Sequence, residues 1–288
     1  MTSRNWTPDF KALQPSFDLS IAEDIGDGDH SALSCLDGQK RGKTRLLIKE
    51  SGIIAGVALA EHLFKYIDPT ANIKVFIEDG SKIEPGDIVL EVEGNAIKLL
   101  QSERLVLNYM QRLSGIATSA SHYAALVAHT KCTVLDTRKT TPGLRTLEKW
   151  AVQLGGGGNH RMGLYDMIML KDNHIDFAGG ILPAVQRVRD YLKSKGKDLK
   201  IEVETRDLNE VREALAAGAD RIMLDNFTPA QTIKAVALIG DQAETESSGG
   251  ITKETLVSYA ECGVDFISIG ALTHQIASLD MSLKAIEE

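Results

Sequence analysis

Cysteine is scarce in this chain: among its 288 residues only Cys35, Cys132 and Cys262 occur, and they lie far apart. An odd number without CxxC spacing excludes a disulfide framework and a cysteine-based zinc site, and it favours a reducing compartment. The sequence also lacks an apolar run near the ~18 residues of a membrane-spanning helix, and its first residues have no signal-peptide pattern. We therefore expect a cytoplasmic protein without a membrane partner.

Positively charged residues are also few, since the chain has 32 lysines and arginines but 40 aspartates and glutamates, which gives a formal net charge of -8. A nucleic-acid binder needs a broad basic field, so this composition predicts no nucleic-acid partner. Any anion site has to be local. The stretch "VLDTRKTTPGLR" is one candidate, since Arg138, Lys139 and Arg145 follow a buried strand pattern there.

A G-x-G-x-x-G fingerprint after the first strand of the second half is also missing, which argues against a dinucleotide fold. The second half instead contains six short apolar runs, each followed by a segment of helix length, at residues 133–137, 166–170, 200–204, 221–225, 243–247 and 265–270. Such alternation predicts parallel strands with covering helices. We expect an α/β fold with an incomplete, six-stranded TIM-like βα barrel, and an open doubly wound sheet is the structural alternative.

The first part of the chain combines strand-like runs at residues 44–50, 73–80 and 87–94 with a helical run at residues 55–66, which predicts a small α+β unit. Between residues 101 and 129 apolar residues recur at intervals of three and four, which predicts a long helix leading into a second domain. The stretch "EDIGDGDHS" looks like a calcium loop, but the twelfth position lacks the required glutamate. We interpret residues 23–31 as a polar loop without a metal.

Polar or glycine-rich residues follow all six apolar runs of the second half. In βα barrels the chemistry lies at the C-terminal ends of the strands. Cations come first along the chain, carboxylates in the middle and glycine loops last, and "GGGGNHRMG" adds His160 and Arg161 between the first two strands. The residues at the strand ends are Arg138, Lys139, Lys171, Asp172, Asn173, His174, Glu204, Asp225, Asn226, Ser248, Gly249, Gly250, Gly270 and Ala271.

This combination suits a substrate with a sugar diol and phosphate at one end and a carboxylated partner at the other. Carboxylates accept hydrogen bonds from ribose hydroxyls and help to hold Mg²⁺, while arginines bind carboxylates bidentately. No nucleophile with a paired base is evident, which favours group transfer catalysed by positioning and electrostatics. Each member also has a structural reading, as a solvated surface cation, a helix cap or a turn glycine.

The motifs "DTRKTTPGLR", "GGGGNHRMGLYDMIMLKDNH", "LDNF", "SSGG" and "ISIGALTH" occur in the order and spacing of the quinolinate phosphoribosyltransferase family. The chain resembles that family over nearly its whole length. The resemblance implies a transferase that converts quinolinate and phosphoribosyl pyrophosphate to nicotinate mononucleotide, pyrophosphate and CO₂ in NAD biosynthesis, with Mg²⁺. It also implies an N-terminal α/β sandwich domain over residues 1–115, joined by the tail 275–288, beside a βα barrel catalytic domain over residues 116–274.

The resemblance implies a role for individual residues, with Lys139, Lys171, Glu204 and Asp225 as the catalytic ones. Glu204 and Asp225 would face the ribose and hold Mg²⁺ indirectly. The expected substrate-binding residues are Arg104, Thr137, Arg138, Lys139, His160, Arg161, Lys171, Glu204, Asp225, Ser248, Gly249, Gly250, Ile269, Gly270 and Ala271. The resemblance further implies that Arg104 is supplied by the neighbouring subunit, so that we expect a homodimer with shared sites, or a hexamer.

Two other functions stay open. A lysine at the end of a barrel strand is the usual nucleophile of a Schiff-base aldolase, and Lys171 has that position. A Schiff-base aldolase would not use the residues that we expect to bind a phosphate and a sugar diol. The second alternative is a non-catalytic, anion-binding relative of the family, and the presence of "LKDNH", residues 171–174 with the preceding leucine, favours the enzyme.

Overall fold

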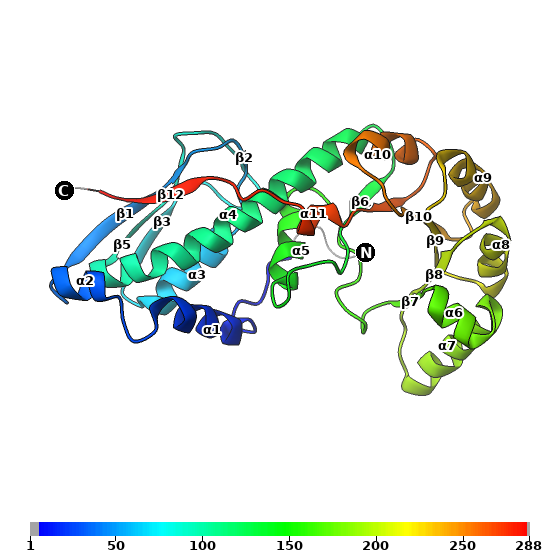
Figure 1. The fold of residues 1–288 in the computed structure, drawn as a ribbon, viewed down its shortest axis with the longest axis horizontal. Coiled ribbons are helices and arrows are strands. Elements are labelled where there is room, and N and C mark those ends of the chain that lie inside the picture. Colours follow the sequence, from blue (N-terminus) through cyan, green and yellow to red (C-terminus); the bar gives the residue numbers. More distant parts are fainter. Residues whose placement is uncertain (1–5, 287–288) are drawn as a thin grey trace. The chain divides into compact units, whose positions relative to one another are not determined.

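The computed structural model describes residues 6–286, and the chain divides into two compact units. The first unit takes in the chain up to Ser121, residues 141–156 and the chain from Leu272 onward, and the second takes in residues 122–140 and 157–271. Each unit combines helices with a sheet, so the chain has a mixed α/β fold (Figure 1). Within residues 6–286 no helix has the length and apolar character to cross a membrane.

The first unit is built on an antiparallel sheet with the strand order β12-β1-β5-β3. Strand β1 pairs with β5 on one side and with the C-terminal strand β12 on the other, so the last residues of the chain complete this sheet. Its elements are α1 (Gln14–Ile25), α2 (His30–Cys35), β1 (Arg41–Ile48), β2 (Gly52–Ile53), α3 (Val57–Ile67), β3 (Asn72–Val75), β4 (Lys82–Ile83), β5 (Ile88–Asn95), α5 (Arg145–Leu154) and β12 (Met281–Ala285).

The predicted long helix is α4 (Ala96–Val127), which begins five residues before the apolar pattern at 101 and buries Leu105, Tyr109 and Leu113. The prediction of a loop over residues 23–31 is correct only for residues 26–29. Helix α1 extends to Ile25, and α2 begins at His30 because Asp29 caps it by accepting a hydrogen bond from the backbone N–H of Ala32.

Residues 141–156 group with the first unit, whereas the sequence division placed them in the barrel domain. Two contacts of α5 within that unit account for the grouping. The Trp150 ring packs edge-on against Phe10 at 5.9 Å between centroids, and buried Glu148 accepts hydrogen bonds from Arg112 at 2.7 and 2.9 Å.

The second unit contains a six-stranded parallel sheet with the order β6-β11-β10-β9-β8-β7, and the six predicted strands are confirmed. Helices α6 to α10 follow one face of this sheet (Figure 1). The elements are β6 (Thr133–Leu135), β7 (Ile168–Leu170), α6 (Asp172–Ala178), α7 (Ile181–Lys195), β8 (Ile201–Thr205), α8 (Leu208–Ala217), β9 (Arg221–Asp225), α9 (Pro229–Ile239), β10 (Glu244–Ser248), α10 (Lys253–Ala260) and β11 (Phe266–Ser268), followed by α11 (Ala271–His274).

Local chemistry explains where several of these helices begin. Asp207 accepts hydrogen bonds from the backbone N–H groups of Asn209 and Glu210 at the start of α8. Thr228 and Gln231 form a reciprocal capping box at the start of α9, with a proline at its first position. Each cap starts its helix shortly after a strand ends, so only short loops remain at the sheet edge.

Candidate active site

The C-terminal ends of the six parallel strands lie along one edge of the sheet, and this edge brings the predicted site residues of the second unit together. The register pairs Ser248 directly with Asp225, and Glu204 lies one strand further along. In sheet order the edge carries Thr137, Arg138 and Lys139 after β6, Ile269, Gly270 and Ala271 after β11, Ser248, Gly249 and Gly250 after β10, Asp225 in β9, Glu204 in β8 and Lys171 after β7.

The order along this edge places cations at both outer strands, with glycine loops and carboxylates between them. Three predicted residues are not part of this set, because His160 and Arg161 lie in the loop between α5 and β7 and Arg104 lies elsewhere. Arg104 is an exposed side chain of α4 in the first unit. Its participation stays a prediction.

The loop that carries His160 and Arg161 is anchored beside β6. Gly158 forms a parallel bridge with Leu135, and a Cβ on Gly158 would lie 2.7 Å from the Leu135 side chain, so a larger residue would require that side chain to shift. Buried Asp136 accepts hydrogen bonds from the His160 backbone N–H at 2.9 Å and from the Asn159 amide at 2.6 Å. Because Asp136 lies two residues before Arg138, it ties together both segments that bear cations.

Two guanidinium groups influence each other in this region. Burial, and then the neighbouring Arg138 cation, lower the pKa of Arg161 from its usual value. Arg161 is half-buried, and its backbone is held by an N–H bond to His160 Nδ1 at 2.7 Å. Cations held close to one another against their repulsion favour an anion between them, which is the property expected of a carboxylate site.

The opposite end of the edge carries a lysine and two carboxylates. Lys171 Nζ makes an ion pair of 2.5 Å with Glu204 Oε2, and the Lys171 backbone N–H donates to His174 Nδ1 at the start of α6. Burial, and then the Glu204 carboxylate, raise the pKa of Asp225, whereas Lys171 and a hydrogen bond from Asn226 lower it. Two carboxylates that repel each other are suited to a hard cation with oxygen ligands, so these residues fit Mg²⁺.

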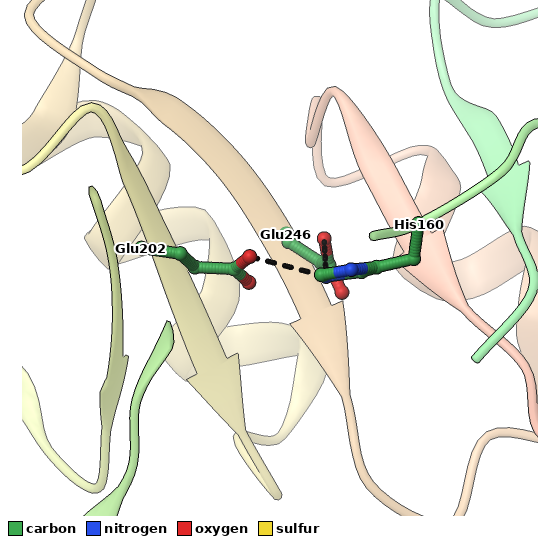
Figure 2. Close-up of side chains that lie close together, drawn as sticks. All are labelled: His160, Glu202 and Glu246. Atoms are coloured by element: carbon green, nitrogen blue, oxygen red, sulfur yellow. Dashed lines mark ion pairs between the residues drawn. The ribbon is translucent and has the colours of Figure 1, made fainter. Parts of the chain in front are cut away.

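The ring of His160 is buried inside the second unit and points toward the carboxylates of Glu202 in β8 and Glu246 in β10 (Figure 2). Its Nε2 is 3.1 Å from Glu202 Oε2 and 3.5 Å from Glu246 Oε2. Arg221 of β9 adds a second cation, with Nη1 at 3.0 Å from Glu246. All four side chains are buried, so the site rests on a charged interior layer.

The groups of this layer shift one another's pKa values. Burial disfavours a charge on His160, but both carboxylates outweigh it and raise the pKa of His160 to about 9. Burial, and then Glu246, raise the pKa of Glu202. His160 and Arg221 are therefore the cationic partners of the two buried carboxylates.

His160, Glu202 and Glu246 offer ligand atoms within 4.8 Å of one another, which is the spacing of a metal site. Without an ion these groups already have charged partners, since His160 Nε2 is 3.1 Å from Glu202 and Glu246 pairs with Arg221 at 3.0 Å. We therefore interpret the cluster as an internal ion-pair network.

This network predicts an order of stabilities. Glu246→Gln should lower the free energy of unfolding by about 3–5 kcal/mol because this buried carboxylate is the partner of both His160 and Arg221. Glu202→Gln should cost less, since burial and Glu246 already raise the pKa of Glu202 and so disfavour its charged form. Glu244→Gln is the comparison with a partly exposed carboxylate that also pairs with Arg221 at 3.0 Å, and it should cost less than Glu246→Gln because solvent screens the change. Urea unfolding measures all three, and a larger loss for Glu202→Gln contradicts the assignment.

Sequence reasoning missed Glu202, Arg221 and Glu246. The only signal was the two-residue period of strands, which places Glu202 on the same face as Glu204 and one layer deeper. A charge in a strand interior was not an obvious candidate, since such groups are rarely buried unless paired. Pairing among three strands and a loop is decided by tertiary structure.

Comparisons with known proteins agree with this geometry. The family model for the N-terminal domain of quinolinate phosphoribosyl transferase matches residues 29–114, and that for the C-terminal domain matches residues 116–284. The chain is 46% identical to the chloroplastic nicotinate-nucleotide pyrophosphorylase [carboxylating] of Arabidopsis thaliana, over 96% of the chain and 83% of the relative. It is 44% identical to the probable nicotinate-nucleotide pyrophosphorylase [carboxylating] of Bacillus subtilis strain 168, over 91% of the chain and 89% of the relative.

Solved structures give the same result. NadC from Streptococcus pyogenes superimposes with a TM-score of 0.92 at 36% identity, covering 98% of this chain and all of the other. The nicotinate-nucleotide pyrophosphorylase from Francisella tularensis superimposes with a TM-score of 0.93 at 36% identity, covering 99% of this chain and all of the other.

Proposed function

The chain belongs to the quinolinate phosphoribosyltransferase family, and from this premise we propose how its own residues perform the reaction. It is a decarboxylating phosphoribosyltransferase of NAD biosynthesis, which joins quinolinate to phosphoribosyl pyrophosphate and releases pyrophosphate and CO₂. The observation that carries the residue assignment is the order along the sheet edge, with cations outside and carboxylates and glycine loops between.

At the quinolinate end, Arg138 and Arg161 bind the two adjacent carboxylates, with Thr137 and Arg104 as further contacts. Lys139 and Lys171 hold the carboxylate beside the ring nitrogen, so that this nitrogen faces the ribose C1. His160 acts through the buried layer rather than by contact, because its ring atoms are engaged with Glu202, Glu246 and the Arg161 N–H. The catalytic contribution here is charge and orientation.

At the phosphoribosyl end, Glu204 and Asp225 accept hydrogen bonds from the ribose hydroxyls and would hold Mg²⁺ indirectly. When bound, Mg²⁺ supplies positive charge to the departing pyrophosphate. The phosphate binds the glycine loops, with Ser248, Gly249, Gly250, Ile269, Gly270 and Ala271 as its residues. Without substrate, Glu204 pairs with Lys171. When quinolinate binds Lys171, the Glu204 carboxylate accepts hydrogen bonds from the ribose instead.

The chemical steps follow from these charges. The C1–O bond to pyrophosphate breaks, and the ring nitrogen of quinolinate attacks the cationic C1. The resulting pyridinium withdraws electrons from the neighbouring ring carbon, so the bond from that carbon to its carboxylate breaks and CO₂ leaves. The electron pair stays on the ring carbon, which then takes up a proton. Lys139 and Lys171 stabilise the negative charge that develops there.

Finer features of the architecture belong to the same proposal. The sheet of the second unit is an incomplete six-stranded βα barrel. The loop of His160 is bridged to β6, yet the His160 ring contacts Glu202 of β8, and this contact supports a strongly curved sheet. The N-terminal domain over residues 1–115 with the tail 275–288 forms an α/β sandwich, and residues 116–274 form the catalytic domain. The protein is a cytoplasmic homodimer, or a hexamer of such dimers, in which each site receives Arg104 of the partner subunit.

The direct test is turnover of the purified protein with quinolinate, phosphoribosyl pyrophosphate and Mg²⁺, with nicotinate mononucleotide as the measured product. Nicotinate in place of quinolinate should react at least roughly a hundredfold more slowly, because the acid with one carboxylate leaves part of the cation cluster without its anion. Chelation of Mg²⁺ in a parallel reaction tests the metal. Comparable turnover of the two acids would contradict the assignment of Arg138 and Arg161 to the quinolinate end.

A further inference from the structure

Asn226, which follows Asp225 at the end of β9, has an unusual backbone. Among residues 6–286 it is the one residue other than glycine with a positive φ, at 56°. Fifteen glycines occupy the other positive-φ positions. Glycine is the residue that adopts this conformation without steric cost, so the backbone alone gives no reason for asparagine here. Compared with glycine, asparagine adds an amide at this position.

The contacts of this side chain join two parts of the phosphoribosyl end. Nδ2 of Asn226 donates a hydrogen bond to Asp225 Oδ2 at 2.6 Å, and the Asn226 backbone N–H donates to the Ser248 carbonyl at 2.9 Å. A Cβ placed on Gly249 would lie 2.2 Å from Asn226 Oδ1. The amide therefore fills the space between the Asp225 carboxylate and the glycine loop after β10.

The amide has no role in the hydrophobic core, because Asn226 is exposed. Strained backbone at an exposed position is commonly retained where it serves a function rather than folding. The amide hydrogen bond of Asn226 ends on Asp225, the carboxylate assigned to the ribose and the metal.

We propose that Asn226 is a positioning residue for phosphoribosyl pyrophosphate: its left-handed backbone turns the amide onto Asp225, and the amide orients this carboxylate and spaces it from the Gly249 loop. The inference rests on the proposed function. It assigns Asn226 no contact with the reacting atoms.

The test separates backbone strain from the amide. Asn226→Gly keeps the favourable backbone and loses the amide, whereas Asn226→Ala loses the amide and adds strain. Both should raise KM for phosphoribosyl pyrophosphate by about tenfold, the usual effect of losing a hydrogen bond to a charged group, and leave KM for quinolinate unchanged. The melting temperature should fall in Asn226→Ala relative to Asn226→Gly. In that case the affinity for phosphoribosyl pyrophosphate depends on the amide, and the melting temperature depends on the backbone conformation.

Gly196→Asn is the matched control. Gly196 follows α7 with a φ of 59° and no atom within 4 Å of an added Cβ, so this variant makes the reverse exchange at a similar backbone angle. Both KM values should stay at those of the natural protein. This control shows whether an asparagine–glycine exchange alone affects the assay.

Titration calorimetry with phosphoribosyl pyrophosphate and Mg²⁺ distinguishes the two ways of failing. If the natural protein binds no phosphoribosyl pyrophosphate, the proposed function fails and the inference fails with it. If the natural protein binds it and Asn226→Gly binds it equally well, only the inference is overturned, and Asn226 is a turn residue. Weakened binding by both glycine and alanine variants supports the inference.

Discussion

Arg161→Ala is expected to lower kcat/KM for quinolinate by roughly 30-fold to several thousandfold, which corresponds to about 2–5 kcal/mol. Arg161 is half-buried beside Arg138, and the repulsion between these two cations favours a bound anion. Replacing Arg161 by alanine leaves the carboxylate of the substrate without this counter-charge. Steady-state kinetics with quinolinate as the varied substrate measure the effect.

Two further variants show whether the loss is specific. Arg161→Lys keeps the charge but not the bidentate geometry, so it should lie between the natural protein and Arg161→Ala. Arg212→Ala removes an exposed arginine of α8 in the same unit and should leave kcat/KM unchanged. Unchanged activity in Arg161→Ala would place this side chain outside the quinolinate site, and an equal loss in Arg212→Ala would indicate a general effect of charge.

Mixing two inactive variants is expected to restore about a quarter of the natural activity. Arg104→Ala and Lys139→Ala are unfolded and refolded together, so that subunits combine at random. In a mixed dimer one site receives Lys139 from the first variant and Arg104 of the partner subunit, and it is whole. Half of the dimers are mixed and half of their sites are whole, which gives about a quarter, given an isologous dimer.

The alternative gives a different result. If Arg104 and Lys139 of one chain belong to the same site, every site lacks one of these two side chains. Mixing the variants then restores no activity. Native mass spectrometry of the mixture verifies that subunits have exchanged, and each variant refolded alone gives the baseline. Absence of recovery in a mixture with verified mixed dimers would contradict the shared site.

Most of the catalytic edge could be predicted from the chain itself. The six strands of the second unit were recognisable because each is a short apolar run before a helix, as at residues 221–225, where four of five residues are buried. Once the strands are parallel, the residue after each one must lie at the same edge. Lys171 and Asp225 could therefore be assigned to one site without coordinates.

Local sequence was less informative where two signals compete. Residues 23–31 are rich in aspartate and glycine and resemble a loop, but Asp29 acts as a helix cap and α2 begins directly after it. A capping carboxylate and a loop carboxylate look the same in a sequence, and neighbouring residues decide between them. The start of α4 at Ala96 was missed for a related reason, because the apolar period is weak over its first turn.

By itself the sequence determined the family chemistry of this protein, since residue type and order along the chain are enough to place cations, carboxylates and glycines at successive strand ends. Only the tertiary structure decided how those groups are held. The interior layer of His160, Glu202, Arg221 and Glu246 joins three strands and a loop, and its ion pairs depend on distances near 3 Å that no spacing encodes. The same is true of Asn226: its identity is visible in the sequence, but the left-handed backbone that turns its amide onto Asp225 is a property of the folded chain.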